Sequence, residues 1–512
     1  MNYSTTFGYD HNLDATIGHE YYRSEGKYLS ASKSKLFSTD NKELGGAVVD
    51  GQSAYSYASA YNNEGWIARL QYNYGERIFT SASVRRDASS RFHPDYRWGE
   101  FWSFGAAWLI SKERWFKADW VNELKLKTSI GQMGNDNIGS YRYTDLFNIT
   151  NSGGEIGTSF ESKGTKDITW EKNTNFNAGL EFTFFNRWSG SIEYYHRKTT
   201  DMLFQLAVAP SLGYTSQWNN VGDMSNSGIE VEMNVNIINR KKLNWDVYFN
   251  LSTIKNHVDM LHQDNKEESL YTFDGKEYKG YTGNSNFFVA EGLSMYTWRL
   301  KKYAGVDKET GEALYYKNVK DEEGNITGTT TTNDWSKADY YIHEGKSTIA
   351  DIIGGFGTSF EAYGFDFSVN CSFQVGGKGY DATYAKFMSA PSGSTTGYNY
   401  HADLLDAWTI GNNNSDIPRF AYGDQYTAAA SDRFLTDASY LNIDNINIGY
   451  TLPGVWTKRI GVNSLRFYAS ADNVFYWSRR QGFDPRQSLT SASSAANYSP
   501  MRSISGGVTI KF

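Results

Sequence analysis

The last ten residues, 503–512, alternate between two kinds of side chain up to the final position of the chain. One face carries Ile504, Gly506, Val508, Ile510 and Phe512, and the other carries serine, glycine, threonine and lysine. Because successive side chains of a β-strand point to opposite faces, this pattern is typical of a membrane strand between lipid and a polar lumen. A strand that ends in water would gain little from a terminal phenylalanine, since chain ends in water usually fray.

The same alternation recurs in four earlier stretches. Residues 176–185, 228–238, 245–252 and 464–477 each place apolar side chains on one face and mostly polar or small side chains on the other. Each stretch is close to the roughly 9 to 11 residues that a tilted strand needs to cross a bilayer. The sequence therefore predicts an all-β fold, a transmembrane antiparallel β-barrel.

Composition supports this prediction and excludes other classes of protein. Aromatic residues make up 16% of the 512 residues, an excess expected where rings collect at two membrane interfaces. The mean hydropathy of −0.59 is compatible with a barrel, because lumen residues and long polar loops dilute the apolar face. No run of about 18 apolar residues is present, which excludes a helical membrane protein. The net charge of −7 leaves no basic stripe for a nucleic acid partner.

Short and long connections alternate along the predicted strands, as they do in a membrane barrel. If residue 512 lies in the periplasm, short turns are expected on that side at Asp10-His11-Asn12, Gly75-Glu76, Asn186, Asn239-Arg240 and Ala362-Tyr363. The long connections, about 24–63, 132–171, 256–350 and 376–437, then all fall on the extracellular side. Working backwards in this way gives about fifteen strands, which form one transmembrane barrel portion over residues 1–512.

Two segments depart from simple alternation. The apolar residues change phase between Ile443 and Ile446, which predicts a β-bulge at Asp444-Asn445. The stretch 256–350 contains short strand patterns of its own, so we expect a folded extracellular excursion there. The single cysteine, Cys371, shares a face with phenylalanines and valines and is interpreted as a small apolar residue.

Seven short stretches together resemble a known family. They are SIGQMGND (129–136), NNVGDMSNSGIEVE (219–232), EAYGFDFSVN (361–370), INIGYTLP (446–453), FYASADNVFYW (467–477), GFDPR (482–486) and YSPMRSISGGVTIKF (498–512). In this order they are similar to the SusC/RagA-like TonB-dependent outer-membrane transporters of Bacteroidetes. The resemblance implies import of oligosaccharides or peptides across the outer membrane of a Gram-negative bacterium. It also implies a plugged barrel of about 22 strands, a SusD-like lipoprotein lid and coupling to the TonB complex.

The chain corresponds only to the C-terminal portion of such a barrel. A signal peptide, an N-terminal domain and a plug are not visible before residue 1, and about seven strands are missing relative to the family. We therefore expect the missing strands and the plug to come from the rest of a longer polypeptide or from a second chain.

Enzymatic and metal-binding interpretations are weaker. His257 and His262 are five positions apart and do not share one side of a strand, and Gly376-Gly377-Lys378-Gly379 lacks the rest of a phosphate loop. The ligand spacing around Asp321 is too degenerate for a calcium loop. The sequence predicts no catalytic residue, no metal and no cofactor. The alternatives that remain are a passive or adhesive outer-membrane barrel, an outer-membrane hydrolase barrel and a secreted carbohydrate-binding protein.

Aromatic residues of the long loops are the candidate substrate contacts. Flat rings suit stacking on sugar rings or peptide groups, but they also suit packing between loops or against the lid. The candidates are Tyr271, Trp298, Trp335, Tyr398 and Tyr400. The resemblance to outer-membrane proteins further implies that Phe512 is an assembly signal for insertion of the barrel.

Overall fold

The computed structural model describes residues 1–208, 210–214, 216–263, 266, 268–283, 286–393, 397, 399–487 and 499–512. The chain divides into two compact units, which are described separately. The first unit contains residues 1–106, 129–174 and 199–221. The second unit contains residues 107–128, 175–198 and 222–512.

The first unit is built on strands that neighbour one another in the order β1-β2-β3-β4-β5-β6-β9-β10. The last four of these strands contribute residues to both units. The bounds are β1 Asn2–Phe7, β2 His11–Leu36, β3 Ala47–Tyr74, β4 Ile78–Ser89, β5 Trp98–Leu109, β6 Val121–Asn135, β9 Glu171–Phe184 and β10 Trp188–Thr200. Two small hairpins complete the unit: β7 Leu146–Ser152 with β8 Glu155–Ser162, and β11 Leu203–Ala207 with β12 Ser216–Asn220.

The second unit continues from the ends of β5, β6, β9 and β10 through β13-β14-β24-β25-β28-β29-β30. These strands are β13 Asp223–Arg240, β14 Leu243–Thr253, β24 Ile352–Ala362, β25 Phe365–Val375, β28 Tyr440–Thr451, β29 Ser464–Ser478 and β30 Ser503–Lys511, and β15 Lys255–Met260 also pairs with β13. Each pairing from β13 to β30 is antiparallel. Among the described residues, fifteen strands follow one another in sheet order, which confirms the predicted fold class and strand number.

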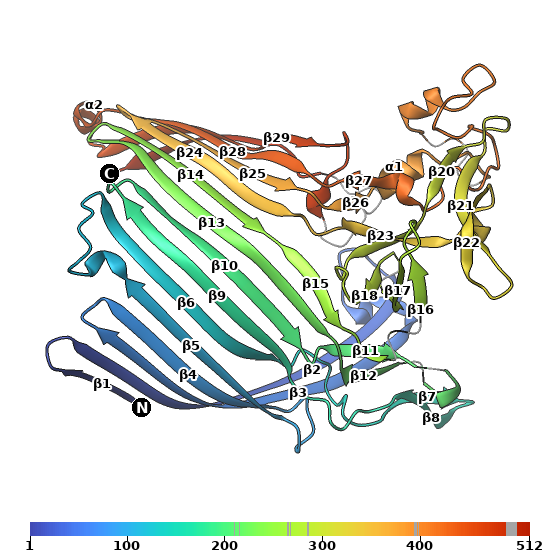
Figure 1. Ribbon diagram of the computed structural model, residues 1–512, viewed down its shortest axis with the longest axis horizontal. Coiled ribbons are helices and arrows are strands. Elements are labelled where there is room, and N and C mark those ends of the chain that lie inside the picture. Colours follow the sequence, from blue (N-terminus) through green and yellow to red (C-terminus); the bar gives the residue numbers. More distant parts are fainter. Residues whose placement is uncertain are drawn as a thin grey trace. The chain divides into compact units, whose positions relative to one another are not determined.

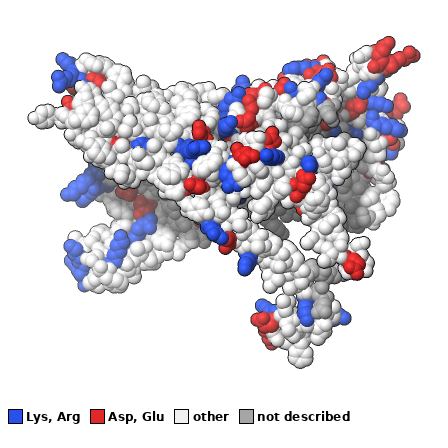
Figure 2. Space-filling model, turned by 90° about the horizontal axis from the view of Figure 1, so that it is seen from below, with Lys and Arg blue, Asp and Glu red and all other residues white. Residues whose placement is uncertain are grey.

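The register of the second unit confirms that the sheet has two chemically different faces. One row of directly paired residues runs Met233, Phe249, Phe356, Cys371, Ile443 and Phe475. The neighbouring row, on the opposite face, runs Asn234, Tyr248, Gly357, Asn370, Asn445 and Asp472. Apolar side chains of the first face remain exposed, for example Phe356 at 40% and Phe475 at 49%. Figure 2 shows a surface area with few charged side chains. A sheet with this outer surface suits lipid rather than water.

The predicted β-bulge is present at Asp444. On the β25 side, Asn370 pairs with Asn445 and Cys371 pairs with Ile443, so Asp444 has no partner in the ladder. On the β29 side, Asn445 pairs with Asp472 and Ile443 pairs with Phe475. The extra residue brings Ile443 and Ile446 onto the same face despite their spacing of three. Asp444 stays on the polar side, where its carboxylate accepts hydrogen bonds from Ser372 Oγ at 2.9 Å and from the Asn442 amide.

Charged side chains are paired on the polar face of the sheet. Arg466 Nε donates to Asp366 Oδ1 at 3.0 Å, and Lys125 Nζ donates to Glu181 Oε2 at 2.9 Å. Lys127 Nζ lies 2.7 Å from Glu193 Oε2. A charged group in hydrocarbon would cost several kcal/mol, so these pairs identify the lumen side of the wall.

Several short turns lie one or two residues away from their predicted positions. The β1–β2 turn occupies residues 8–10 rather than 10–12, β13–β14 turns at Lys241-Lys242, and β24–β25 turns at Tyr363-Gly364. Two-residue hairpin turns favour positive φ at both central positions. Tyr363 and Gly364 have φ of 51° and 97°, which fixes the register there. The β3–β4 turn occupies residues 75–77, which include the predicted Gly75-Glu76, with φ of 54° and 52°.

The stretch 24–63, expected as a long loop, is mostly strand. β2 and β3 pair without a break from His11↔Tyr74 to Ala31↔Ala54 and, after a register shift, on to Leu36↔Ala47. The connection is therefore only residues 37–46. Small, polar and tyrosine side chains, which suggested a loop, form an extended two-stranded ribbon because each strand satisfies the other's backbone groups.

The stretch 256–350 is a folded excursion, as predicted. It contains β16 Glu268–Tyr271, β17 Glu277–Thr282, β18 Phe288–Ala290, β19 Thr297–Lys301, β20 Tyr303–Val306, β21 Ala313–Lys320, β22 Ile326–Thr332 and β23 Tyr340–Ser347. The connection 376–437 adds β26 Lys378–Tyr380, helix α1 Ala382–Phe387 and β27 Leu435–Asp437. Within the second unit these elements lie at one end of the sheet strands, and helix α2 Gly454–Thr457 lies at the other (Figure 1). Among the described residues, no helix is long and apolar enough to cross a membrane.

The two faces predict unequal effects for substitutions at neighbouring positions of β13. Val235 belongs to the apolar face and Asn234 to the polar face. We expect Val235→Arg to destabilise the assembled barrel by about 2 to 4 kcal/mol near the bilayer midplane, and Asn234→Arg to have a much smaller effect. Urea unfolding in lipid vesicles measures the difference, and equal stabilities of the two variants would contradict the face assignment.

Candidate functional site

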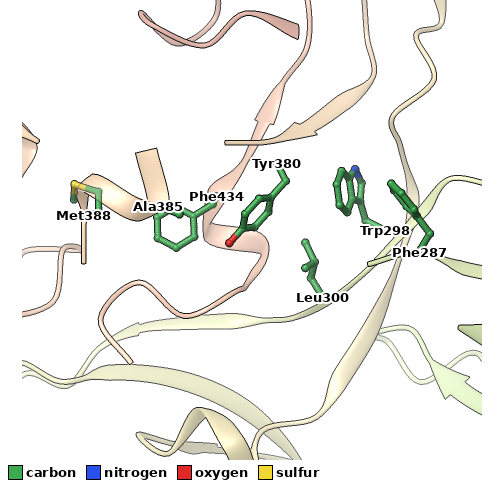
Figure 3. Packing of buried hydrophobic residues seen from close by; sticks show 7 residues of the cluster. All are labelled: Phe287, Trp298, Leu300, Tyr380, Ala385, Met388 and Phe434. Carbon is green, nitrogen blue, oxygen red and sulfur yellow. The ribbon is translucent and has the colours of Figure 1, made fainter. Parts of the chain in front are cut away.

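The two longest loops fold together into one outer-loop body, defined as residues 256–350 and 376–437. Its largest buried cluster takes Phe287, Trp298 and Leu300 from the first loop and Tyr380, Ala385, Met388 and Phe434 from the second. Figure 3 shows the rings of Trp298 and Tyr380 close to Leu300 in this cluster. Because each loop supplies about half of this cluster, the burial of these seven residues depends on both loops.

Trp298 is part of this core rather than of an open surface. Its side chain is 1% exposed, and its ring centroid lies 4.6 Å from that of Phe287. The indole N–H donates to the carbonyl oxygen of Lys378 at 2.7 Å, which joins β19 to β26. The structure thus places Trp298, which was predicted to contact substrate, in a buried position between the two loops.

Trp335 is half-buried at the edge of the same body. Its indole N–H donates to the carbonyl oxygen of Ala430 at 2.8 Å, and Lys301 Nζ lies 4.0 Å from the ring centroid. Lys301 Nζ also donates to the Trp335 carbonyl oxygen at 2.6 Å. Burial lowers the pKa of this ammonium group. The ring therefore already stacks on a cation of the protein, and only its outer part is open to a ligand.

The remaining candidates lie on separate parts of the chain. Tyr271 is half-buried at the end of β16, opposite Glu277. Tyr400 packs edge-on against Phe420, with ring centroids 4.9 Å apart. Tyr398 lies outside the described residues. The described contacts therefore do not gather the predicted aromatic residues around a single site.

A cavity of about 660 Å³ opens on the polar face of the second unit. Its lining includes the carboxylates Glu193, Glu230 and Glu232 together with Asn250 and Arg486. Glu193 is paired with Lys127, while Glu230 accepts a hydrogen bond from Ser252 Oγ at 3.5 Å. The cavity gives the lumen wall of this unit a patch in which three carboxylates lie beside apolar side chains such as Val231 and Leu251.

His343 is a buried titratable group of the outer-loop body. Its Nε2 lies 3.3 Å from the carbonyl oxygen of Leu300, and its Nδ1 lies 3.8 Å from Asp432 Oδ2. Burial is the main cause that lowers its pKa to about 4, and the nearby Asp432 opposes this shift. Lys302, whose Nζ is 3.7 Å from the same carboxylate, and Lys346 add positive charge around the ring. The imidazole is therefore neutral at pH 7.

One group of tyrosines was missed from the sequence. Tyr28, Tyr55, Tyr57 and Tyr61 lie on β2 and β3 within the stretch first interpreted as loop, and Tyr22 lies on β2 just before it. The segment AYSYASAY, residues 54–61, places three tyrosines at odd positions. This period of two was the signal that could have revealed them.

Comparisons with known proteins agree with the geometry. The sequence profile of the family described as TonB dependent receptor-like, beta-barrel matches residues 1–474. TonB-dependent receptor P3 of Formosa agariphila is 26% identical over all of this chain and 52% of its own length. TonB-dependent receptor SusC of Bacteroides thetaiotaomicron is 28% identical over 84% of this chain and 42% of its own length.

A solved structure shows the same fold over the entire chain. The structure titled "Structure of the RagAB peptide transporter" superimposes with a TM-score of 0.86 and 26% identity. It covers 100% of this chain and 54% of the solved chain. The chain thus spans about half the length of the relatives that it matches, and the resemblance to SusC/RagA-like receptors is confirmed.

The environment of His343 predicts a pH-dependent loosening of the outer-loop body. Its folded pKa of about 4 lies below the ordinary value of 6.5, so the unfolded state binds more protons between these values. The stabilisation is present above pH 6.5 and is lost as the pH falls toward 4, by about 2 kcal/mol at pH 5. Hydrogen exchange of β19 and β23 at pH 7 and pH 5 measures it. His343→Gln should flatten the pH dependence, whereas His401→Gln should not, and an unchanged profile in His343→Gln would refute the assignment.

Proposed function

Because the chain belongs to the TonB-dependent receptor-like β-barrel family, we propose that it forms part of the wall of an energised outer-membrane importer. Membership in this family implies location in the outer membrane, and the family consists of receptors and transporters rather than enzymes. The observation that carries the proposal is the two-faced antiparallel sheet, whose apolar face suits lipid and whose polar face suits a lumen.

The proposed cargo is an oligosaccharide or a peptide. One relative carries the name SusC, and a solved relative is titled a peptide transporter. Tyr271, Trp335, Tyr398 and Tyr400 remain candidate contacts for this cargo on the outer-loop body, while buried Trp298 is left out. Phe512 is 86% exposed next to β30, and its role as an assembly signal stays a prediction.

The proposed assembly needs partners besides the bilayer. A plug and further strands would come from the rest of a longer polypeptide or from a second chain, and the TonB complex would supply energy through that part. We further propose that the outer-loop body is the platform for a SusD-like lipoprotein lid. Its support is a folded core that two long connections share, which gives the platform a fixed shape.

The competing function is a passive or adhesive outer-membrane barrel. Both functions share the lipid-facing wall, so they differ in their dependence on energy. Uptake of a labelled cargo oligosaccharide or oligopeptide by cells should stop when tonB is deleted or when a protonophore collapses the proton gradient. Uptake that continues at the same rate under both conditions would contradict energised import and favour a passive pore.

The shared core predicts how the lid contact can be lost without losing the barrel. We expect Trp298→Ala to remove about 3 to 5 kcal/mol of packing from the outer-loop body, because its ring and its hydrogen bond join both loops. Co-purification of the SusD-like protein should fall while the barrel still assembles in the membrane. Tyr422→Ala, at a 71% exposed position of the same body, is the matched control. Full retention of the lid by Trp298→Ala would contradict the platform proposal.

A further inference from the structure

The ribbon formed by β2 and β3 extends beyond the neighbouring strand β4. β4 pairs with β3 only as far as Asn63. Beyond this point β2 and β3 pair with each other from Ser24↔Tyr61 to Leu36↔Ala47. This distal ribbon belongs entirely to the first unit.

One side of the ribbon carries no charged residue over five consecutive pairs. The pairs on this side are Tyr22↔Asn63, Ser24↔Tyr61, Gly26↔Ser59, Tyr28↔Tyr57 and Ser30↔Tyr55. We call these ten residues the tyrosine face. The charged residues of the same segment, Arg23, Glu25, Lys27 and Glu64, fall on the opposite side. Strand alternation therefore separates the ribbon into an uncharged side and a charged side.

Three tyrosines of this face form a continuous aromatic shelf. The rings of Tyr28 and Tyr57 are stacked with centroids 5.2 Å apart, and those of Tyr55 and Tyr57 are stacked at 6.3 Å. Tyr28 lies 5.6 Å from Tyr55. Their exposed fractions are 44%, 55% and 55% for Tyr28, Tyr55 and Tyr57, so the shelf presents open ring surface.

The tyrosine face continues into the polar face of the sheet. Glu20 lies on the same face of β2 as Tyr22, two residues before it in the sequence. The Glu20 carboxylate lies 3.3 Å from the Arg85 guanidinium. Arg85 in turn donates to Asp87 at 2.7 Å. The apolar residues Ile17, Tyr21, Trp66 and Leu70 belong to the other phase and are 46% to 60% exposed. The shelf therefore lies on the lumen side of the wall, beyond the last pair of β3 with β4.

A polar cluster fixes the base of this face. Tyr61 Oη donates to Asp136 Oδ2 at 2.9 Å, and Ser89 Oγ donates to the same oxygen at 2.6 Å. The Arg91 guanidinium lies 4.7 Å from the Tyr61 ring centroid and also donates to the Asp136 carboxylate at 3.3 Å. Tyr61 is thus held by the protein, whereas the shelf above it has open rings.

We propose that the tyrosine face is a binding site for a neutral oligosaccharide at the mouth of the lumen. This inference rests on the proposed function, because it places the site on the route of the cargo. Rings of tyrosine offer large, rigid contact area at low entropic cost, and serine and tyrosine hydroxyls offer adaptable hydrogen bonds. A pyranose presents apolar C–H faces to such rings and hydroxyls to their rims. The face lacks the charges that would pair with the termini or ionised side chains of a peptide.

Binding measurements on the full-length protein in detergent test the site. The probes are maltohexaose, cellohexaose, xylohexaose, laminarihexaose and mannohexaose, each titrated by calorimetry. We expect at least one probe to bind, with affinity lowered tenfold or more by Tyr28→Ala or Tyr57→Ala. Tyr57→Phe, which keeps the ring, should retain most of the affinity. Tyr21→Ala is the matched control, since Tyr21 is 58% exposed on the opposite side of β2.

The other outcomes separate a failure of this inference from a failure of the proposed function. Absence of binding for all five probes, or equal binding by wild type, Tyr28→Ala and Tyr57→Ala, contradicts the site. Binding of a neutral oligopeptide that depends on the same tyrosines would assign the face to another ligand class. If energised uptake survives while sugar binding ignores these tyrosines, this inference fails and the proposed function stands. If sugar binding depends on them but uptake needs no energy, the site stands and energised import fails.

Discussion

The requirement that every backbone N–H and C=O be paired inside a bilayer determines the rest of this structure. An unpaired group in hydrocarbon costs several kcal/mol, so a strand that faces lipid must have a hydrogen-bonded neighbour. From β13 to β30 the register is continuous, and its interruptions are single-residue shifts such as that at Asp444. The antiparallel ladder in turn imposes a side-chain period of two, and this period gives the wall one face for lipid and one for the lumen.

The two faces obey opposite rules for burial and charge. Side chains such as Phe356 and Phe475 stay exposed on the apolar face because that face suits lipid. Arg466 and Asp366 form an ion pair on the polar face. The outer-loop body follows the rules of a water-soluble domain instead, with Trp298 and Phe434 at 1% exposure in its core. One chain therefore contains two packing regimes, and the change between them occurs where the sheet strands end. A fixed body on a lipid-anchored wall is suited to presenting a partner or cargo to the lumen.

The sequence predicted the features that depend on periodicity alone. Alternation located the strands, and the phase change between Ile443 and Ile446 located the bulge, because both follow from the geometry of a single strand. Turn positions such as Tyr363-Gly364 were shifted by one, since two residues with positive φ, not composition, set that register. The burial of Trp298 could not be predicted from the sequence, because its partners Tyr380 and Phe434 come from a second loop far along the chain. The ribbon of β2 and β3 was mistaken for a loop because serine, glycine and tyrosine are common to both.

That ribbon shows why composition and period have to be weighed together. Serine, glycine and tyrosine carry little strand preference as a set, but placed in alternate positions on two paired strands they give one uncharged side. A loop of the same composition would scatter its rings, and each would lose rotamer freedom separately on meeting a ligand. In the ribbon the backbone ladder has already ordered Tyr28, Tyr55 and Tyr57 against one another. The ordering cost is met by folding rather than by binding, so a shelf of modest area can hold a weakly interacting, uncharged ligand.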